Sequence, residues 1–313
     1  MSRTAYAARR LLQLVPLLLG ILLLVFLLLK ITPGDPARVI LGIRASDAQI
    51  HALREQLGLN DPILVQYVHY VERVLHGDLG LSIRTGQPVT AIIGERLPVT
   101  LWLLAMGSVF AVLLAIPMAM LAAIRQDRGP DHAVRGATLV GLTLPPYWVG
   151  IILIAFIALP TGAFPVSGYG TGLSGHLQAM ILPSVALAIA LAPVLVRSLR
   201  ARLIEIGEAD YISMAYAVGI SQRRVIWRHA FPNGLLPLVT LLAVEIGFAL
   251  FGAVAIETTF SLPGLGQGMV DAVNNRDFTV VQGITLVFAL LVVLVHLLAD
   301  LAYTVIDPRV ELR

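Results

Sequence analysis

The chain has 313 residues, of which 58% are hydrophobic and only 13% are charged. Soluble domains carry about 25% charged residues, so this composition indicates a polytopic membrane protein and excludes an ordinary soluble one. The net charge of +3 argues against nucleic-acid binding, and the absence of cysteine excludes disulfides, thiolate metal sites and a cysteine nucleophile.

The first apolar segment is the uncharged run at residues 11–29, which follows three arginines. About 20 apolar residues cross the hydrocarbon core, so this run predicts a transmembrane helix. A cleaved signal peptide is the alternative. It fits less well because the run exceeds the roughly 7–15 apolar residues of such a peptide, and the following ITPGDP offers no small-residue cleavage site.

Residues 31–98 are predicted to fold as short helices outside the membrane. Ser46 and Gln49 form a capping box for the first, and Gly58 is placed to end it. A second helix closes at Gly77. Its predicted apolar face is Leu64, Tyr67, Val68, Val71 and Leu75. Because each helix has one apolar stripe, the insertion either braces the spans or docks an outside partner.

Five further apolar segments complete six predicted transmembrane helices. They are residues 99–124, about 138–160, 177–196, 234–256 and about 279–305. Arginines gather at the N-terminus, after the second and fourth spans and in the C-terminal tail, whereas the loop after the third span has none. Since basic residues collect on the cytoplasmic side, both termini are predicted to lie in the cytoplasm.

Common catalytic motifs are missing from the sequence. A phosphate-binding P-loop needs Gly-Lys-Ser/Thr, and the only lysine, Lys30, lies between Leu29 and Ile31. No histidine precedes a glutamate, which excludes a His-Glu-x-x-His metalloprotease, and Gly-x-Ser-x-Gly does not occur. The chain is therefore predicted not to be an enzyme by itself, with no catalytic residue and no metal site.

A basic segment at residues 200–233 lies between the fourth and fifth apolar segments. It predicts a short helix that ends at Gly219, with Tyr211 and Ala215 on the same face. A second short helix follows, and Pro232 is expected to prevent it from running smoothly on. From the residues alone, two interpretations stay open: an elbow held by a partner protein, and a juxtamembrane loop attracted to anionic lipid.

Within this segment, EADYISMAYAVGISQRRVIWRHAFPN resembles the EAA loop of bacterial ABC-importer permeases. The resemblance is to the B-type subunit of the branch that handles dipeptides, oligopeptides and nickel. Further motifs of that branch follow in order along the chain. They are GDP at 34–36, LGLNDPILVQY at 57–67, GDLGLS at 77–82, RLPVTL at 96–101, LPS at 182–184, IETTFSLPGLGQ at 256–267 and ADLAYTVIDPRV at 299–310.

The resemblance implies an all-α, type I ABC-importer permease with six transmembrane helices. It divides the chain into the tail and first helix at 1–30, an extracytoplasmic helical insertion at 31–98 and a permease core at 99–313. In that family two related permeases form the pore, two ATPase subunits bind ATP and Mg²⁺, and an extracytoplasmic binding protein delivers substrate. The implied function is peptide import by alternating access across the bacterial plasma membrane, with no cofactor in this chain.

The resemblance also implies that the EAA helix lies in a groove of the ATPase. Carried onto this chain, the coupling residues are Glu208, Asp210, Tyr211, Ala215, Gly219, Arg223 and Arg224. The sequence departs from the family pattern at Val218, where many relatives have Lys, and at Ala209, where an acidic residue is common. Individual ion pairs with the ATPase are therefore not implied.

The end of the fifth span is predicted to be either a structural turn or an outer gate at the pore mouth. Proline and glycine break the helix there, and a carboxylate at membrane depth is costly unless it is paired or hydrated. The residues are Glu257, Phe260, Pro263, Gly264 and Gly266. Polar residues elsewhere in the last two spans are intramembrane functional candidates, with a bond to a neighbouring helix as the alternative for Glu245 and a structural role favoured for Asp300. They are Glu245, His296 and Asp300.

Two alternative functions stay open. The same scaffold could import nickel, haem or a glycosylated compound instead of a peptide. A secondary transporter or a membrane scaffold, working without an ATPase, is the alternative from another class.

Overall fold

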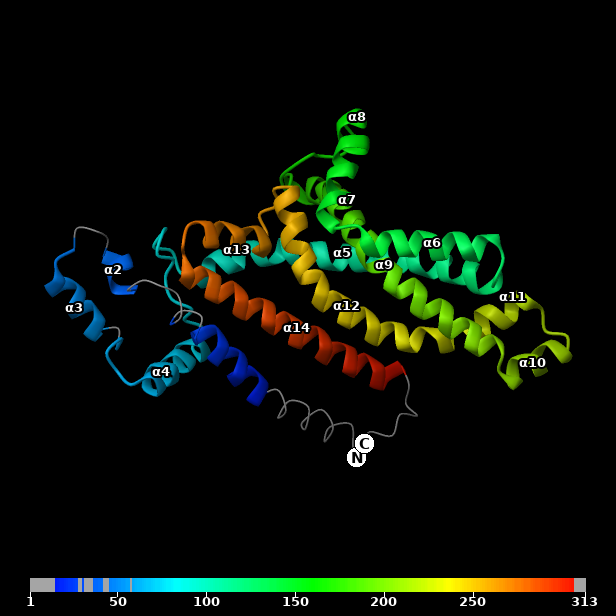
Figure 1. Ribbon diagram of the computed structural model, residues 1–313, viewed down its shortest axis with the longest axis horizontal. Helices are drawn as coiled ribbons and strands as arrows, with labels where there is room; N and C mark the ends of the chain where they lie inside the picture. The colour runs from blue at the N-terminus through cyan, green and yellow to red at the C-terminus, as the bar shows by residue number, and fades with distance from the viewer. Residues whose placement is uncertain (1–14, 28–29, 31–35, 42–44, 57, 307–313) are drawn as a thin grey trace. The chain divides into compact units, whose positions relative to one another are not determined.

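The structure is a computed structural model that describes residues 15–27, 30, 36–41, 45–56 and 58–306. Every regular element in those ranges is a helix, and one isolated bridge joins Leu81 to Pro88 (Figure 1). The predicted all-α fold is thereby confirmed. The chain forms two compact units, Met1–Leu97 with Gly268–Val293, and Pro98–Gln267 with Leu294–Arg313. Each unit is described by itself below.

Unit 1 contains the short helices of the insertion. Its elements are an unlabelled helix at Val15–Leu27, α2 (Pro36–Leu41), α3 (Asp47–Gln56), α4 (Ile63–Leu75), most of α13 (Leu265–Asn274) and the first half of α14 (Phe278–Ile306). The capping box of α3 is confirmed: the Ser46 amide donates to Gln49 Oε1 at 3.0 Å, and the Gln49 amide donates to Ser46 Oγ at 3.4 Å. Gly58 and Gly77 follow α3 and α4 at positive φ, as predicted for helix ends.

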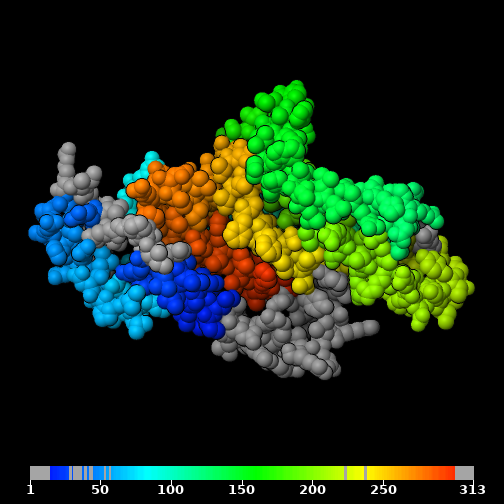
Figure 2. Space-filling model, in the orientation of Figure 1, coloured from blue at the N-terminus to red at the C-terminus, as the bar shows by residue number. Residues whose placement is uncertain are grey.

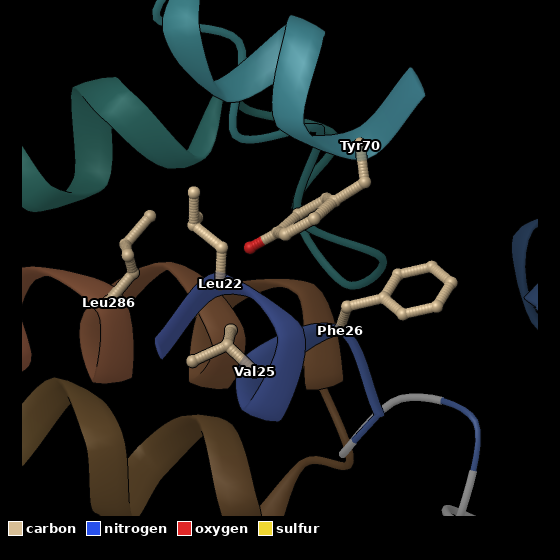
Figure 3. Close-up of a cluster of buried hydrophobic side chains, with 5 residues drawn as sticks. All are labelled: Leu22, Val25, Phe26, Tyr70 and Leu286. Atoms are coloured by element: carbon tan, nitrogen blue, oxygen red, sulfur yellow. The ribbon is translucent and has the colours of Figure 1, made fainter. Parts of the chain in front are cut away.

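Helix α4 packs against the first helix of the chain. The Tyr67 hydroxyl donates a 2.7 Å hydrogen bond to the Leu19 carbonyl, and Phe26 lies against the rings of Tyr67 and Tyr70. Tyr70 belongs to a buried apolar cluster in unit 1 (Figure 3). Its members are Leu22, Val25, Phe26, Tyr70 and Leu286. The insertion therefore braces the first helix and α14.

The prediction of which side chains form the inward apolar face of α4 is only partly correct. Tyr67 and Val71 pack inward as predicted, and Tyr70 and Val74 join them. The remaining predicted members are exposed instead, namely Leu64, Val68 and Leu75. The inward face is rotated from the predicted one because aromatic Tyr70 packs on Phe26.

A loop after α4 is held by one buried carboxylate. The Ser82 hydroxyl and the Ile83 amide both donate to Asp277, which lies just before α14 and is 4% exposed. Because a buried carboxylate needs several donors, this contact fixes the loop to the start of α14.

Unit 2 is built around α9 (Gly172–Gly207), which packs against α6, α7 and α12. The other elements are most of α5 (Val89–Ile124), α6 (Gly129–Thr143), α7 (Pro146–Leu153), the π-helical turn η1 (Ile154–Ala158), α8 (Leu159–Thr161), α10 (Asp210–Ala217), α11 (Gln222–Val225), the π-helical turn η2 (Ile226–Ala230) and α12 (Phe231–Thr259). Small residues bring these helices close together. A Cβ on Gly107 of α5 would come within 2.7 Å of Leu187 on α9.

The six predicted spans are recovered only in part. Among the described residues, four helices are long and apolar enough to cross a membrane, and five if the bent pair α6 and α7–α8 counts as one span. The first predicted span is described only over Val15–Leu27, so its remainder lies outside the described residues.

The prediction of one continuous helix over about 138–160 is wrong. Helix α6 ends at Thr143, and α7 leaves it at an angle of 103°. Pro145 and Pro146 cause the break, because proline removes amide donors and forces the preceding residue, Leu144, into an extended conformation (ψ 120°).

The prediction that Pro232 prevents the second short helix from running smoothly on agrees with the π-helical turn η2, which distorts the helix just before that residue. Helix α11 runs through η2 into α12 without a gap. Both π-helical turns precede a proline by one residue, at Pro160 and at Pro232. A π-helical turn widens the helix, which relieves the clash between a proline ring and the carbonyl four residues earlier.

Candidate functional site

The segment between α9 and α12 forms a short helix with a well-defined end. Helix α10 stops at Ala217, and Gly219 takes the left-handed conformation at φ 84°. The Gly219 amide donates to Tyr216, and the Ile220 amide donates to Ala215, each at 3.0 Å. This pair of hydrogen bonds is a Schellman motif, so the predicted helix stop at Gly219 is present.

Helix α10 buries one side and exposes the other. Ile212 and Ala215 point into the protein, at 1% and 9% exposure. Tyr211, Met214 and Val218 are at least half exposed and share a stripe, since they lie at i, i+3 and i+7. On the face shown in Figure 2, the yellow-green atoms of α10 and α11 lie at one end of unit 2.

This burial separates two residues that the sequence grouped together. Tyr211 is exposed as a partner-binding residue must be, whereas Ala215 packs inside this chain. Glu208 and Asp210 are exposed at the start of the segment, and Arg224 is exposed in α11. The side chain of Arg223 lies outside the described residues. The exposed apolar stripe adds Met214 and Val218, which the resemblance did not assign to the coupling surface.

An ion pair absent from the sequence prediction anchors α9 just before α10. Arg200 donates two hydrogen bonds of 2.6 Å to the carboxylate of Asp131, which is fully buried in α6. The Asp127 amide donates a third, at 2.9 Å. Sixty-nine residues separate the two partners, so no local pattern in the sequence could have paired them.

Glu257, at the end of α12, is buried within a hydrogen-bonded turn. The Thr100 hydroxyl donates to its carboxylate at 2.7 Å, and the Gln267 amide donates at 3.1 Å. Thr100 in turn accepts a 2.9 Å hydrogen bond from the amide of Leu265. The carboxylate thus accepts hydrogen bonds from α5 and from the first turn of α13.

The glycines of this turn make room for the carboxylate. A Cβ on Gly264 would overlap the Glu257 carboxylate, and one on Gly266 would come within 2.9 Å of it. Phe260 is buried, whereas Pro263 is exposed at the turn. Of the two interpretations that the sequence left open, this geometry agrees with a structural turn. The role as a gate stays a prediction.

Two of the remaining polar candidates of the last two spans have described side chains, and they lie on different helices. Glu245 is half-buried in the middle of α12, and His296 is exposed on α14. Asp300 continues α14 one turn later, but its side chain lies outside the described residues. Among the described residues, no group of three His, Asp or Glu side chains could hold a metal ion.

The described fold is that of an all-helical, multi-pass membrane protein. It resembles solved chains of the inward-facing MetNI methionine ABC transporter, with a TM-score of 0.59 at 16% identity over 69% of this chain and 96% of that chain. This similarity extends to the fold and not to the substrate.

The chain belongs to the family of binding-protein-dependent transport system inner membrane components, whose model matches residues 111–312. The N-terminal model of such membrane components matches residues 3–104. Within the family, the chain is a permease subunit of the peptide branch of ABC importers, integral to the inner membrane. Such permeases work with ATPase and binding-protein partners.

Two relatives cover the chain almost completely. It is 36% identical over 313 residues to the oligopeptide transport system permease protein AppB of Bacillus subtilis, covering 98% of this chain and 99% of AppB. It is 37% identical over 307 residues to the glutathione transport system permease protein GsiC of Salmonella typhimurium, covering 98% of each.

Proposed function

We propose that this subunit imports peptides into the cytoplasm as one half of a permease heterodimer driven by two ATPase subunits. ATP and Mg²⁺ bind to those partners, and this chain carries no catalytic residue or cofactor of its own. An extracytoplasmic binding protein delivers the peptide, both termini lie in the cytoplasm, and the peptide crosses between the two permeases by alternating access. The names of AppB and GsiC support a peptide-like cargo.

The exposed stripe of α10 is the main support for the proposal that this helix binds the ATPase subunits. A short helix joined to two membrane-embedded helices exposes Tyr211, Met214 and Val218 while its other side is buried. Exposed aromatic and Met side chains are enriched at protein interfaces. Two residues separate the start of α10 from the end of α9, the two helices are in contact, and the Asp131–Arg200 pair fixes the end of α9 to α6. A force applied to α10 therefore reaches the membrane-embedded helix α9 directly.

Copurification tests the coupling surface. Met214→Asp places a charge in the centre of the stripe and is expected to release the ATPase subunits from a tagged permease. Ser213→Asp is the matched control, because Ser213 is exposed on the same helix outside the stripe. Equal ATPase recovery with both variants would contradict the assignment of α10.

Uptake measurements test the cargo separately. A strain that lacks this gene and any redundant importer is expected to lose uptake of short peptides, and the restored gene is expected to return it. Normal peptide uptake in the deletion strain would exclude peptides. Loss of nickel or haem uptake instead would identify another cargo on the same scaffold.

A further inference from the structure

The exposed side of α4 has no packing partner within the described chain. Leu64, Val68 and Leu75 are 74%, 60% and 78% exposed, although all three are large and apolar. An α-helix turns about 100° per residue, which places the three side chains within about 40° of one another. They form a stripe along the whole helix. Because leaving such an apolar stripe in water costs free energy, we expect another apolar surface to cover it.

Helix α4 presents three different faces around its circumference. Tyr67, Tyr70 and Val74 pack on the first helix and on the cluster around it. The apolar stripe lies next to that face, and His69 and Arg73 lie exposed beyond the stripe. A helix with a protein face, an apolar face and a polar face, in that order, matches a helix that lies at a membrane surface beside a transmembrane segment.

The contacts of α4 run along the apolar helix Val15–Leu27, from Leu19 to the lysine that follows its C-terminal end. Tyr67 reaches the Leu19 carbonyl and Phe26, and the amine of Lys30 donates a hydrogen bond to Gln66 Oε1. Leu24, on the same apolar helix, is 66% exposed. A lysine that follows an apolar run extends its amine to the headgroup region, so Gln66 lies near that level.

We propose that α4 is an interfacial helix whose Leu64, Val68 and Leu75 stripe inserts into the membrane leaflet beside the helix Val15–Leu27. The stripe continues the lipid-facing surface of that helix. His69 and Arg73 face the headgroups and water, and Tyr70 fixes the rotation of α4 by packing on Phe26 (Figure 3). The insertion thus anchors this subunit to lipid as well as bracing its first helix.

Site-directed fluorescence tests this assignment, because the chain contains no cysteine and one introduced thiol is unique in this subunit. Leu64→Cys and Leu75→Cys are labelled with a small fluorophore in the assembled importer, with reactive cysteines removed from its partners. His69→Cys is the matched control on the polar face. The complex is placed in lipid nanodiscs that contain a nitroxide-labelled phospholipid, and iodide is the quencher in water.

The expected result is that the lipid quencher removes roughly half or more of the emission at the two stripe positions, because an interfacial helix buries its apolar face at the acyl boundary. Iodide is expected to act mainly on His69→Cys. Strong iodide quenching at Leu64→Cys, particularly if the binding protein relieves it, would overturn the proposal in favour of a docking surface. Protection from both quenchers would overturn it in favour of burial under another subunit. If a labelled variant fails to assemble, Val68→Cys gives the same measurement.

Discussion

Arg200 and Asp131 form a bidentate ion pair in which both hydrogen bonds are 2.6 Å long. The pair joins α9 to α6 ten residues before α10 begins, and the carboxylate is fully buried. Planar pairing of a guanidinium with a carboxylate fixes both distance and orientation. The pair therefore holds the end of α9 that carries the proposed coupling helix.

Arg200→Ala is expected to destabilise the subunit by about 3 kcal/mol, because it leaves the Asp131 carboxylate buried without its partner. Thermal unfolding of the solubilised importer measures the effect. Arg197→Ala is the control, since Arg197 is exposed on the same helix. The double variant Asp131→Ala/Arg200→Ala is expected to recover part of the loss, and equal stability of the Arg200 and Arg197 variants would contradict a structural role.

Gly264→Ala is expected to destabilise the turn after α12 by about 1–3 kcal/mol, because its Cβ would overlap the buried Glu257 carboxylate. Gly136→Ala is the control, since a Cβ on Gly136 in α6 would meet no atom within 4 Å. Membrane protein yield and unfolding temperature are measured. If Glu257→Ala keeps normal yield and unfolding temperature but loses transport, the gating interpretation is favoured over the structural one.

Gly219→Asp is expected to uncouple ATP hydrolysis from transport while the protein still inserts. Gly219 is exposed at φ 84°, and Asn tolerates this left-handed conformation better than most residues. Gly219→Asn is therefore a control of nearly equal size that lacks the charge. The aspartate adds a negative charge at the carbonyl end of α10, which is unfavourable. Identical transport by the two variants would show that charge at this position has no effect.

Tyr70 predicts a pH dependence in strong alkali. Burial raises the pKa of the Tyr70 hydroxyl to about 12. The folded state then binds more protons than the unfolded state above the usual tyrosine pKa of about 10. This contribution to stability is complete below about pH 10 and is lost as the pH rises toward about 12. The unfolding temperature of Tyr70→Phe is expected to fall less steeply across this range than that of the unaltered protein.

Local signals in the sequence predicted local structure well. The Ser46–Gln49 capping box and the stops at Gly58, Gly77 and Gly219 are present because each depends on a few neighbouring residues. The adjacent prolines Pro145 and Pro146 are a local signal of the same kind for a helix break. The sequence prediction missed this break because the residues on both sides are apolar. Hydropathy measures whether residues dissolve in lipid and does not register a turn of 103°.

Non-local relationships could not be predicted in this way. The inward position of Ala215 and the exposure of Met214 depend on how α10 rests on its neighbours, and α10 is too short for periodicity to define one side. The pairing of Thr100 with Glu257 joins residues 157 positions apart. Glu257 stood out as a carboxylate in an apolar segment, but only the structure supplies its donors.

Helix α10 is proposed to transmit the work of ATPase partners to the membrane-embedded helices. The most direct measurement is ATP-driven uptake of labelled peptide into proteoliposomes that contain the complete importer and its binding protein. Uptake is expected to require ATP, to be abolished by Met214→Asp and to be preserved by Ser213→Asp. Undiminished uptake by Met214→Asp, or uptake by this permease without ATPase subunits, would contradict this role of α10.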